Sequence, residues 1–164
     1  ACERLRVLPP GIQDPPRVPS LGPTAGTGAL GECAMRAALP YLLVGVGGFL
    51  GANARFVLSR WVGALVDTRF PLGTLVVNVS GSFALGLVAT LVLQRLVPSS
   101  DEVRLAVSVG FLGAFTTFST FGFETHGLLE DGSWVTALAN ILGSVALSLV
   151  AVRAGILTAR AWLS

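Results

Sequence analysis

The chain carries little charge and lacks lysine altogether. Only 12% of its 164 residues are charged, 52% are hydrophobic, and all eleven basic residues are arginines. A water-soluble domain carries about a quarter charged residues, so the composition excludes an ordinary soluble domain. The net charge of +2 is too small, and the arginines are too scattered, for a nucleic-acid-binding surface. We therefore expect a membrane protein with no nucleic-acid partner.

The residues that build zinc and redox sites are also scarce. The chain has one histidine, His126, and two cysteines, Cys2 and Cys33, which lie far from it in the sequence. A structural zinc site needs four such ligands, so neither a zinc site nor a structural disulfide is supported. Glu124 and His126 are close neighbours, but no nucleophile converges on them, and we do not expect an enzyme.

The first 34 residues contain no long apolar run. Seven of the nine prolines fall within the first forty residues, together with both cysteines. This composition predicts a disordered, proline-rich extension over residues 1–34. The only methionine, Met35, lies just before the first hydrophobic segment. We expect the extension to lie upstream of the true start and residues 35–164 to form the functional unit.

Four apolar stretches are long enough to cross a bilayer, which takes about 20 residues per helix. They cover residues 38–61, 70–94, 105–123 and 132–153, with short polar connections between them. The predicted fold is an all-α membrane protein with antiparallel neighbouring helices and both termini on one side. Five arginines flank the spans on that side and three on the other. This bias weakly favours a cytoplasmic N-terminus, and it leaves open whether one orientation or both occur.

Polar side chains inside the second and fourth spans need a reason, because they are costly in lipid. The second span carries Asn78, and the fourth places Asn140, Ser144 and Ser148 four residues apart, on one helix face. Such groups either join neighbouring helices by hydrogen bonds or line a polar path through the bundle. The sequence leaves both readings open.

Glycines and one arginine distinguish the first span. Gly47 and Gly51 form a GxxxG pair, which predicts close contact with another helix. Arg55 ends the span, where an arginine commonly reaches from the apolar region to the membrane surface.

The third span is the least typical of a lipid-facing helix. Gly110 and Gly113 precede the sequence TTFST, which places hydroxyl groups in the middle of the membrane. Irregular backbone is tolerated there only where it is buried or lines a cavity, so we expect a break in this helix. Phe118 and Phe121 share a face, and the positive edges of their rings could contact an anion.

Three motifs together resemble the CrcB/Fluc family of fluoride channels. They are GGFLGANARF at 47–56, GTLVVNVSGSFALG at 73–86 and GFLGAFTTFSTF at 110–121, and the resemblance covers residues 38–155. It implies a fluoride-selective passive channel in the cell (inner) membrane, which exports fluoride from the cytoplasm and prevents its toxicity. It also implies four-span subunits with a broken third span. These subunits would form an antiparallel, dual-topology homodimer, or a heterodimer where a paralogous partner exists.

The resemblance also implies roles for individual residues. A structural sodium ion at the dimer centre would be held by the backbone carbonyls of Gly113 and Thr116, and Arg55 would have a structural or vestibule role. The implied fluoride pathway comprises Asn78, Phe118, Phe121, Ser119, Thr120, Ser144 and Ser148. The chain departs from the family pattern at Ala114, where glycine is common, and at Asn140, where tyrosine is frequent. Val152 ends the polar face of the fourth span without a hydroxyl.

Two other classes of membrane protein remain as alternatives. A small multidrug-type transporter normally needs a carboxylate within the membrane. All nine acidic residues lie in the extension, in the loops or, for Glu124, at the end of a span. A non-transporting helical subunit would explain the glycines but not the hydroxyl groups clustered beside two aromatic rings.

Overall fold

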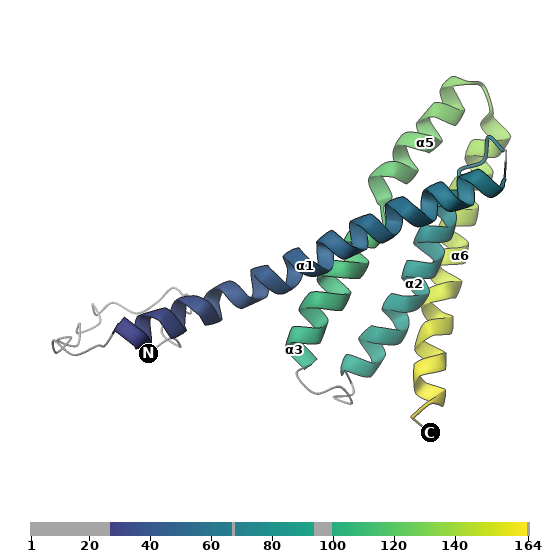
Figure 1. The fold of residues 1–164 in the computed structure, drawn as a ribbon. Coiled ribbons are helices and arrows are strands. Elements are labelled where there is room, and N and C mark those ends of the chain that lie inside the picture. Colours follow the sequence, from purple (N-terminus) through teal and green to yellow (C-terminus); the bar gives the residue numbers. More distant parts are fainter. Residues whose placement is uncertain (1–26, 67, 94–99, 164) are drawn as a thin grey trace, which may run out of the picture. The chain divides into compact units, whose positions relative to one another are not determined.

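The computed structural model describes residues 27–66, 68–93 and 100–163, shown as a ribbon in Figure 1. Its contacts divide the chain into two units, Ala1–Leu39 and Pro40–Ser164. The predicted extension lies outside the described residues as far as residue 26, and helix α1 begins at Thr27. Every regular element in the described ranges is a helix.

Seven helical segments follow one another along the chain. They are α1 (Thr27–Leu65), α2 (Leu72–Leu93), α3 (Ser100–Val103), the π-helical segment η2 (Arg104–Leu112), α4 (Gly113–Phe115), α5 (Phe118–Glu130) and α6 (Trp134–Ala161). Four stretches of helix are long and apolar enough to span a bilayer: Met35–Leu65, Leu72–Val92, Asp101–Glu130 and Trp134–Ala161. The predicted four membrane-spanning helices are therefore confirmed. The third stretch extends past the predicted limit at 123, so Glu124 lies within it and not at its end.

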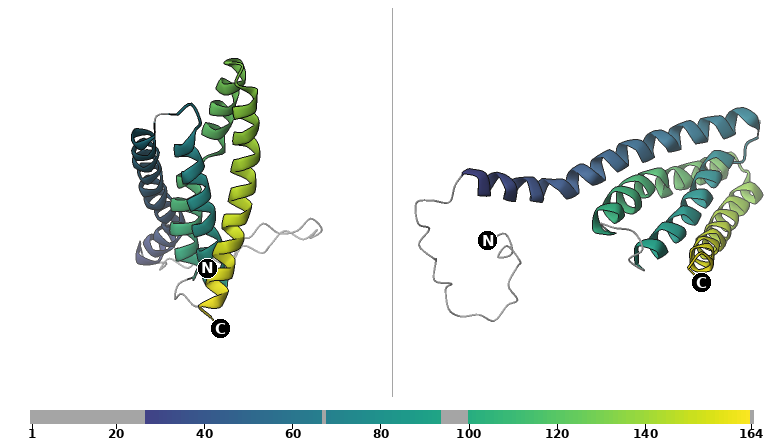
Figure 2. Two further views of the ribbon diagram at one scale, coloured as in Figure 1. Left: turned by 90° about the vertical axis from the view of Figure 1, so that its right-hand side faces the viewer. Right: turned by 60° about the horizontal axis from the view of Figure 1, so that its bottom comes forward.

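Helices α2 and α6 form the main packed pair of the second unit and lie side by side in Figures 1 and 2. Gly86 of α2 lies against the main chain of Val152, and Gly155 of α6 lies against the main chain of Phe83. A Cβ atom at either glycine would overlap the carbonyl of the facing helix. Hydrogen in place of a side chain thus lets the two backbones approach closely.

The glycine pair of α1 makes a similar contact within the second unit. Gly47 lies against the carbonyl of Ala106, and Gly51 against the carbonyl of Phe111. Both partners belong to η2, so the contact predicted from the GxxxG spacing is confirmed. This packing brings α1 to the segment just before the TTFST sequence.

The backbone changes direction between α4 and α5. Thr116 has φ −79° and ψ 154°, and Thr117 has φ −148° and ψ 118°, both extended conformations. Before them, η2 is π-helical, a geometry that is rare and frequently found at functional sites. Thr117 then caps α5, because its side chain accepts a hydrogen bond from the Thr120 N–H at 3.2 Å.

A tight turn joins α5 to α6 and sets these helices beside each other. Gly132 adopts φ +72°, a left-handed conformation that favours glycine. The N–H of Ser133 donates to the carbonyl of Leu128 at 2.8 Å, which closes the turn. As a result, the first half of α6 packs against α5.

Candidate functional site

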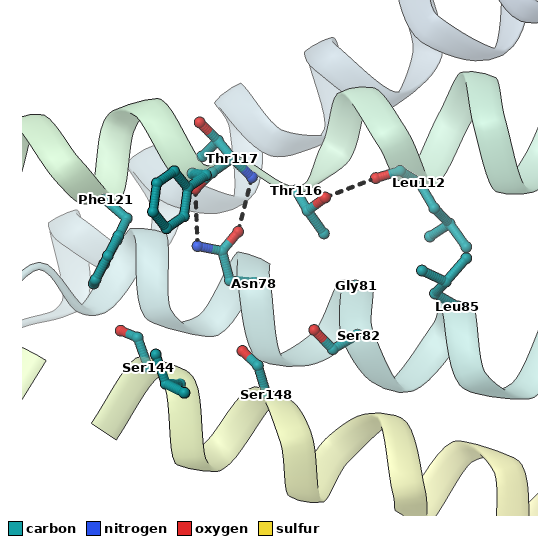
Figure 3. A pocket seen from close by; sticks show the side chains of 12 residues that line it. Asn78, Gly81, Ser82, Leu85, Leu112, Thr116, Thr117, Phe121, Ser144 and Ser148 are labelled. Carbon is teal, nitrogen blue, oxygen red and sulfur yellow. Dashed lines mark hydrogen bonds between the residues drawn. The ribbon is translucent and has the colours of Figure 1, made fainter. Parts of the chain in front are cut away.

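A cavity of about 290 Å³ lies between α2, the α4–α5 junction and α6 (Figure 3). Polar side chains from all three parts face it, together with both rings of the predicted phenylalanine pair. Its lining residues are Asn78, Gly81, Ser82, Leu85, Leu112, Thr116, Thr117, Phe118, Phe121, Ser144, Val145 and Ser148. The structure thus brings together five of the seven predicted pathway residues, and Thr116 of the predicted sodium site.

Asn78 binds the main chain at the α4–α5 junction through both ends of its amide. Its Nδ2 donates to the carbonyl of Thr117 at 3.0 Å, and its Oδ1 accepts from the N–H of Thr117 at 2.8 Å (Figure 3). This pairing satisfies an extended residue that has no helical partners of its own. Asn78 therefore holds the junction in place from α2. One of the two Nδ2 hydrogens remains for a ligand in the cavity.

The same hydrogen bonds change the surroundings of two carbonyl groups. In a continuous helix, the Thr117 N–H would donate to Gly113, and the Thr120 N–H to Thr116. Here the first N–H donates to Asn78 and the second to the Thr117 hydroxyl. The carbonyls of Gly113 and Thr116 thus lack the donors of a continuous helix, and unwound backbone carbonyls of this kind coordinate Na⁺ in some transporters with broken helices.

The hydroxyl groups of the TTFST sequence form a small cluster. Thr117 Oγ1 lies 3.0 Å from Thr120 Oγ1 and 3.4 Å from Ser119 Oγ. Ser119 is exposed and Thr120 is half-buried, and neither lines the cavity. These two predicted pathway residues therefore lie next to the cavity, not in its wall.

The two phenylalanines of the predicted pair differ sharply in exposure. Their ring centroids are 5.5 Å apart and the ring planes are tilted by 43°. Phe121 is only 9% exposed, whereas Phe118 is 83% exposed. Phe121 thus packs inside this subunit, while the ring of Phe118 projects from it.

The predicted polar face of α6 meets the cavity at two positions. Ser144 and Ser148 both line it (Figure 3), and Ser144 is only 7% exposed. Asn140, one turn before Ser144, is buried away from the cavity and donates to Thr125 Oγ1 at 2.8 Å. Val152 lies outside the cavity lining, where its main chain packs on α2.

The other predicted residues lie in helical segments and do not line the cavity. Gly113 and Ala114 belong to α4, so the methyl group of Ala114 sits on ordinary helical backbone. Gly113 is exposed. Arg55 of α1 is half-buried, and the lining of the main cavity does not include it.

A second cavity, of about 270 Å³, lies near the start of α2 and is bordered by Glu124. Thr74 donates to Glu124 Oε1 at 2.9 Å. In the described part of the chain, the buried Glu124 Oε2 has no hydrogen-bond partner. Glu124, the acidic side chain well inside the third span, is therefore hydrogen-bonded to α2 through only one of its two carboxyl oxygens.

The sequence alone did not reveal the roles of Thr117 and Gly81. Thr117 contacts Asn78 through its main chain and caps α5 through its side chain. A threonine just before a helix is a favoured N-cap residue, and this signal could have identified Thr117. Gly81 faces the Thr116 methyl group and the Phe115 ring, where a Cβ would collide with both. Only the packing of α2 on the junction reveals that requirement.

Comparison with known proteins gives matches across this whole region. The family described as CrcB-like protein, Camphor Resistance (CrcB), matches residues 42–156. A fluoride-specific ion channel of Solibacter usitatus is 49% identical over 122 residues, covering 74% of this chain and 99% of the relative. Another of that name from Geobacter sulfurreducens is 50% identical over 119 residues, covering 73% of this chain and 95% of the relative. All the site residues described above lie within the matched family region.

Proposed function

We propose that this chain, which belongs to the CrcB family, is a passive channel that lets fluoride leave the cytoplasm. It is a multi-pass membrane protein, and its relatives carry the name of fluoride-specific ion channels. Hydrogen fluoride enters cells as a neutral acid and then dissociates. An anion channel lets the trapped ion leave down its electrical gradient, which lowers intracellular fluoride without ATP.

The observation that carries this proposal is the mixed lining of the main cavity. Fluoride is a hydrogen-bond acceptor, and the Asn78 amide and the Ser148 hydroxyl supply donors from opposite sides of the cavity. Ser144 also lines the cavity, beside Ser148 on α6. Phe118 and Phe121 supply ring edges of partial positive charge. In this proposal fluoride exchanges water for these groups as it passes. The hydroxyl groups of Ser119 and Thr120 would donate hydrogen bonds to fluoride just outside the cavity.

Arg55 is the proposed vestibule residue of the path. Arg55 would act near the entrance, where its positive charge attracts anions without holding them in the narrow part. A conduction path must bind its ion weakly enough to release it. Partial charges from rings, hydroxyls and one amide meet that condition better than a buried arginine would.

The proposed resident cation is sodium, held by the carbonyl oxygens of Gly113 and Thr116. These carbonyls are among those at the junction that lack the N–H donors of a continuous helix. Sodium bound there would add positive charge beside the α4–α5 junction. In this proposal the junction is a true break in the third span, in the middle of the bilayer.

The proposed assembly is an antiparallel, dual-topology homodimer; a heterodimer with a paralogous chain would bury the same surface. The exposed Phe118 ring supports an assembly, and Gly113 and Ser119 are exposed as well. In a twofold dimer, one patch contacts the same patch on the partner. The sodium site would then receive carbonyls from both subunits.

The proposed export is tested in a bacterium whose own fluoride channel genes have been deleted. Expression of this chain should restore growth in medium containing sodium fluoride, whereas equal sodium chloride should affect neither strain. Membrane fractions are assayed to show that the protein is present. Continued fluoride sensitivity with the protein in the membrane would contradict the proposal.

A further inference from the structure

Three hydrogen bonds in series run from the main cavity into the contact between α6 and α5. Ser144 Oγ lies 3.2 Å from Asn140 Oδ1, and Asn140 Nδ2 lies 2.8 Å from Thr125 Oγ1. Thr125 Oγ1 lies 2.7 Å from the carbonyl oxygen of Phe121. All three side chains are buried, and Asn140 is only 1% exposed. The series links a cavity-lining hydroxyl to the main chain of a cavity-lining ring.

The end of the series determines the direction of every bond in it. The Phe121 carbonyl can only accept, so Thr125 must donate its single hydroxyl hydrogen there. Thr125 Oγ1 must then accept from Asn140, which turns the amide oxygen of Asn140 towards Ser144. That oxygen also accepts only, so Ser144 must donate to it. The one hydrogen of the Ser144 hydroxyl is therefore directed to Asn140, and only lone pairs remain for the cavity.

We propose that Asn140 is a positioning residue that weakens the hold of the cavity on fluoride by engaging the Ser144 hydrogen. This inference rests on the proposed fluoride pathway. A hydroxyl whose hydrogen is engaged offers an anion no donor. If fluoride captures that hydrogen, Asn140 Oδ1 is left unpaired in a buried position, which costs free energy. In both cases Asn140 makes binding at Ser144 weaker than a free serine would make it.

The weakening favours conduction, because an ion held too tightly leaves slowly. On the opposite side of the cavity, Asn78 keeps one amide hydrogen for the ion. Asn78 therefore offers fluoride a hydrogen-bond donor, whereas the hydrogen of the Ser144 hydroxyl is already bonded to Asn140. Asn140 sets this difference without lining the cavity itself.

The test uses Asn140→Leu, which keeps the branched shape of the side chain but removes both the acceptor and the donor of the amide. Fluoride efflux from liposomes is measured over a range of internal fluoride concentrations for the wild-type protein and the variant. The concentration for half-maximal rate should fall about tenfold or more, the ratio that one hydrogen bond to a charged group gives. The maximal rate should not rise. The conservative variant Thr125→Ser, which retains all three bonds, should match the wild-type protein.

A double-mutant comparison separates this role from simple packing of α5 on α6. In a Ser144→Ala background, Asn140→Leu should leave the half-maximal concentration unchanged, since no hydroxyl is left to release. An equal shift in both backgrounds, or no shift in either, would overturn the inference. If Asn140→Leu does not fold, Thr125→Val replaces it. That variant frees the amide of Asn140 to turn over and should shift the concentration in the same direction.

Failure of the proposed function gives a different result. A well-folded wild-type protein without fluoride efflux would contradict the proposed channel itself. Normal wild-type efflux with an unchanged half-maximal concentration in Asn140→Leu and Thr125→Val would contradict only the role of Asn140.

Discussion

Asn78 joins two helices and also faces the cavity proposed as the ion path. Its amide pairs with both main-chain groups of Thr117, and it also faces the main cavity. The sequence left open whether this asparagine joins helices or lines a path. The geometry shows the helix-joining bonds and also places Asn78 in the cavity wall, because those bonds use only part of the amide's hydrogen-bonding capacity.

Replacing Asn78 with leucine should lower stability and fluoride flux together. Two hydrogen bonds are lost, and an extended main-chain segment is left unpaired, so the free energy of unfolding should fall by about 1–3 kcal/mol. Tryptophan fluorescence during denaturant titration in detergent measures this change. The matched control is Asn53→Leu, since Asn53 is exposed and bonds only within α1. Equal stability of the Asn78 variant and the wild-type protein would show that the junction does not depend on this pairing.

The two phenylalanines allow the ring-edge hypothesis to be tested separately from folding. Phe118→Ile or Phe121→Ile should slow fluoride efflux about tenfold or more, because an aliphatic side chain has no positive edge. Phe118 is 83% exposed in the subunit, so its replacement should leave the fold of the subunit intact. Phe123, also on α5 and 80% exposed, provides the control Phe123→Ile. Normal efflux in both of the first two variants would exclude the ring-edge contact.

Among the helices, the sequence predicted most of what depends on apolar length and spacing. Four spans and the Gly47–Gly51 contact follow from such patterns, and the structure contains them. The bond series through Asn140 and the fit of Gly81 against Phe115 could not be predicted in this way. They depend on which faces of α2, α5 and α6 meet, and pairing of helices leaves little trace in one sequence. The identities of the two ions, fluoride and sodium, were predicted from the family resemblance and not from residue chemistry.

The close packing of α2 on α6 predicts a contrast between two glycines of one helix. Gly155→Ala should destabilise the protein by about 1–3 kcal/mol, because the added Cβ meets the main chain of Phe83. Gly143→Ala meets nothing within 4 Å and should be neutral or stabilising by about 0.5–1 kcal/mol. Denaturant titration of both variants compares these values. A smaller loss at Gly155 than at Gly143 would rule out this packing.

For the whole molecule, the weak asymmetry of the arginines leaves the orientation in the membrane open. Dual topology predicts that a label in the turn between α5 and α6 is accessible from both sides of the membrane. Asp131→Cys, in a chain with Cys2 and Cys33 replaced by serine, places a single thiol in this exposed turn. In intact cells, a membrane-impermeant maleimide should label about half of the copies, and lysis should expose the rest. Labelling of all copies or none before lysis would indicate a single orientation.

The most direct measurement is the release of fluoride from liposomes containing the purified wild-type chain. The vesicles are loaded with potassium fluoride and potassium chloride, and a potassium ionophore is added to allow charge-balanced efflux. Ion-selective electrodes follow each anion. The fluoride-channel account predicts rapid release of fluoride while chloride stays inside. Equal release of both anions, or no release from well-folded protein, would contradict it.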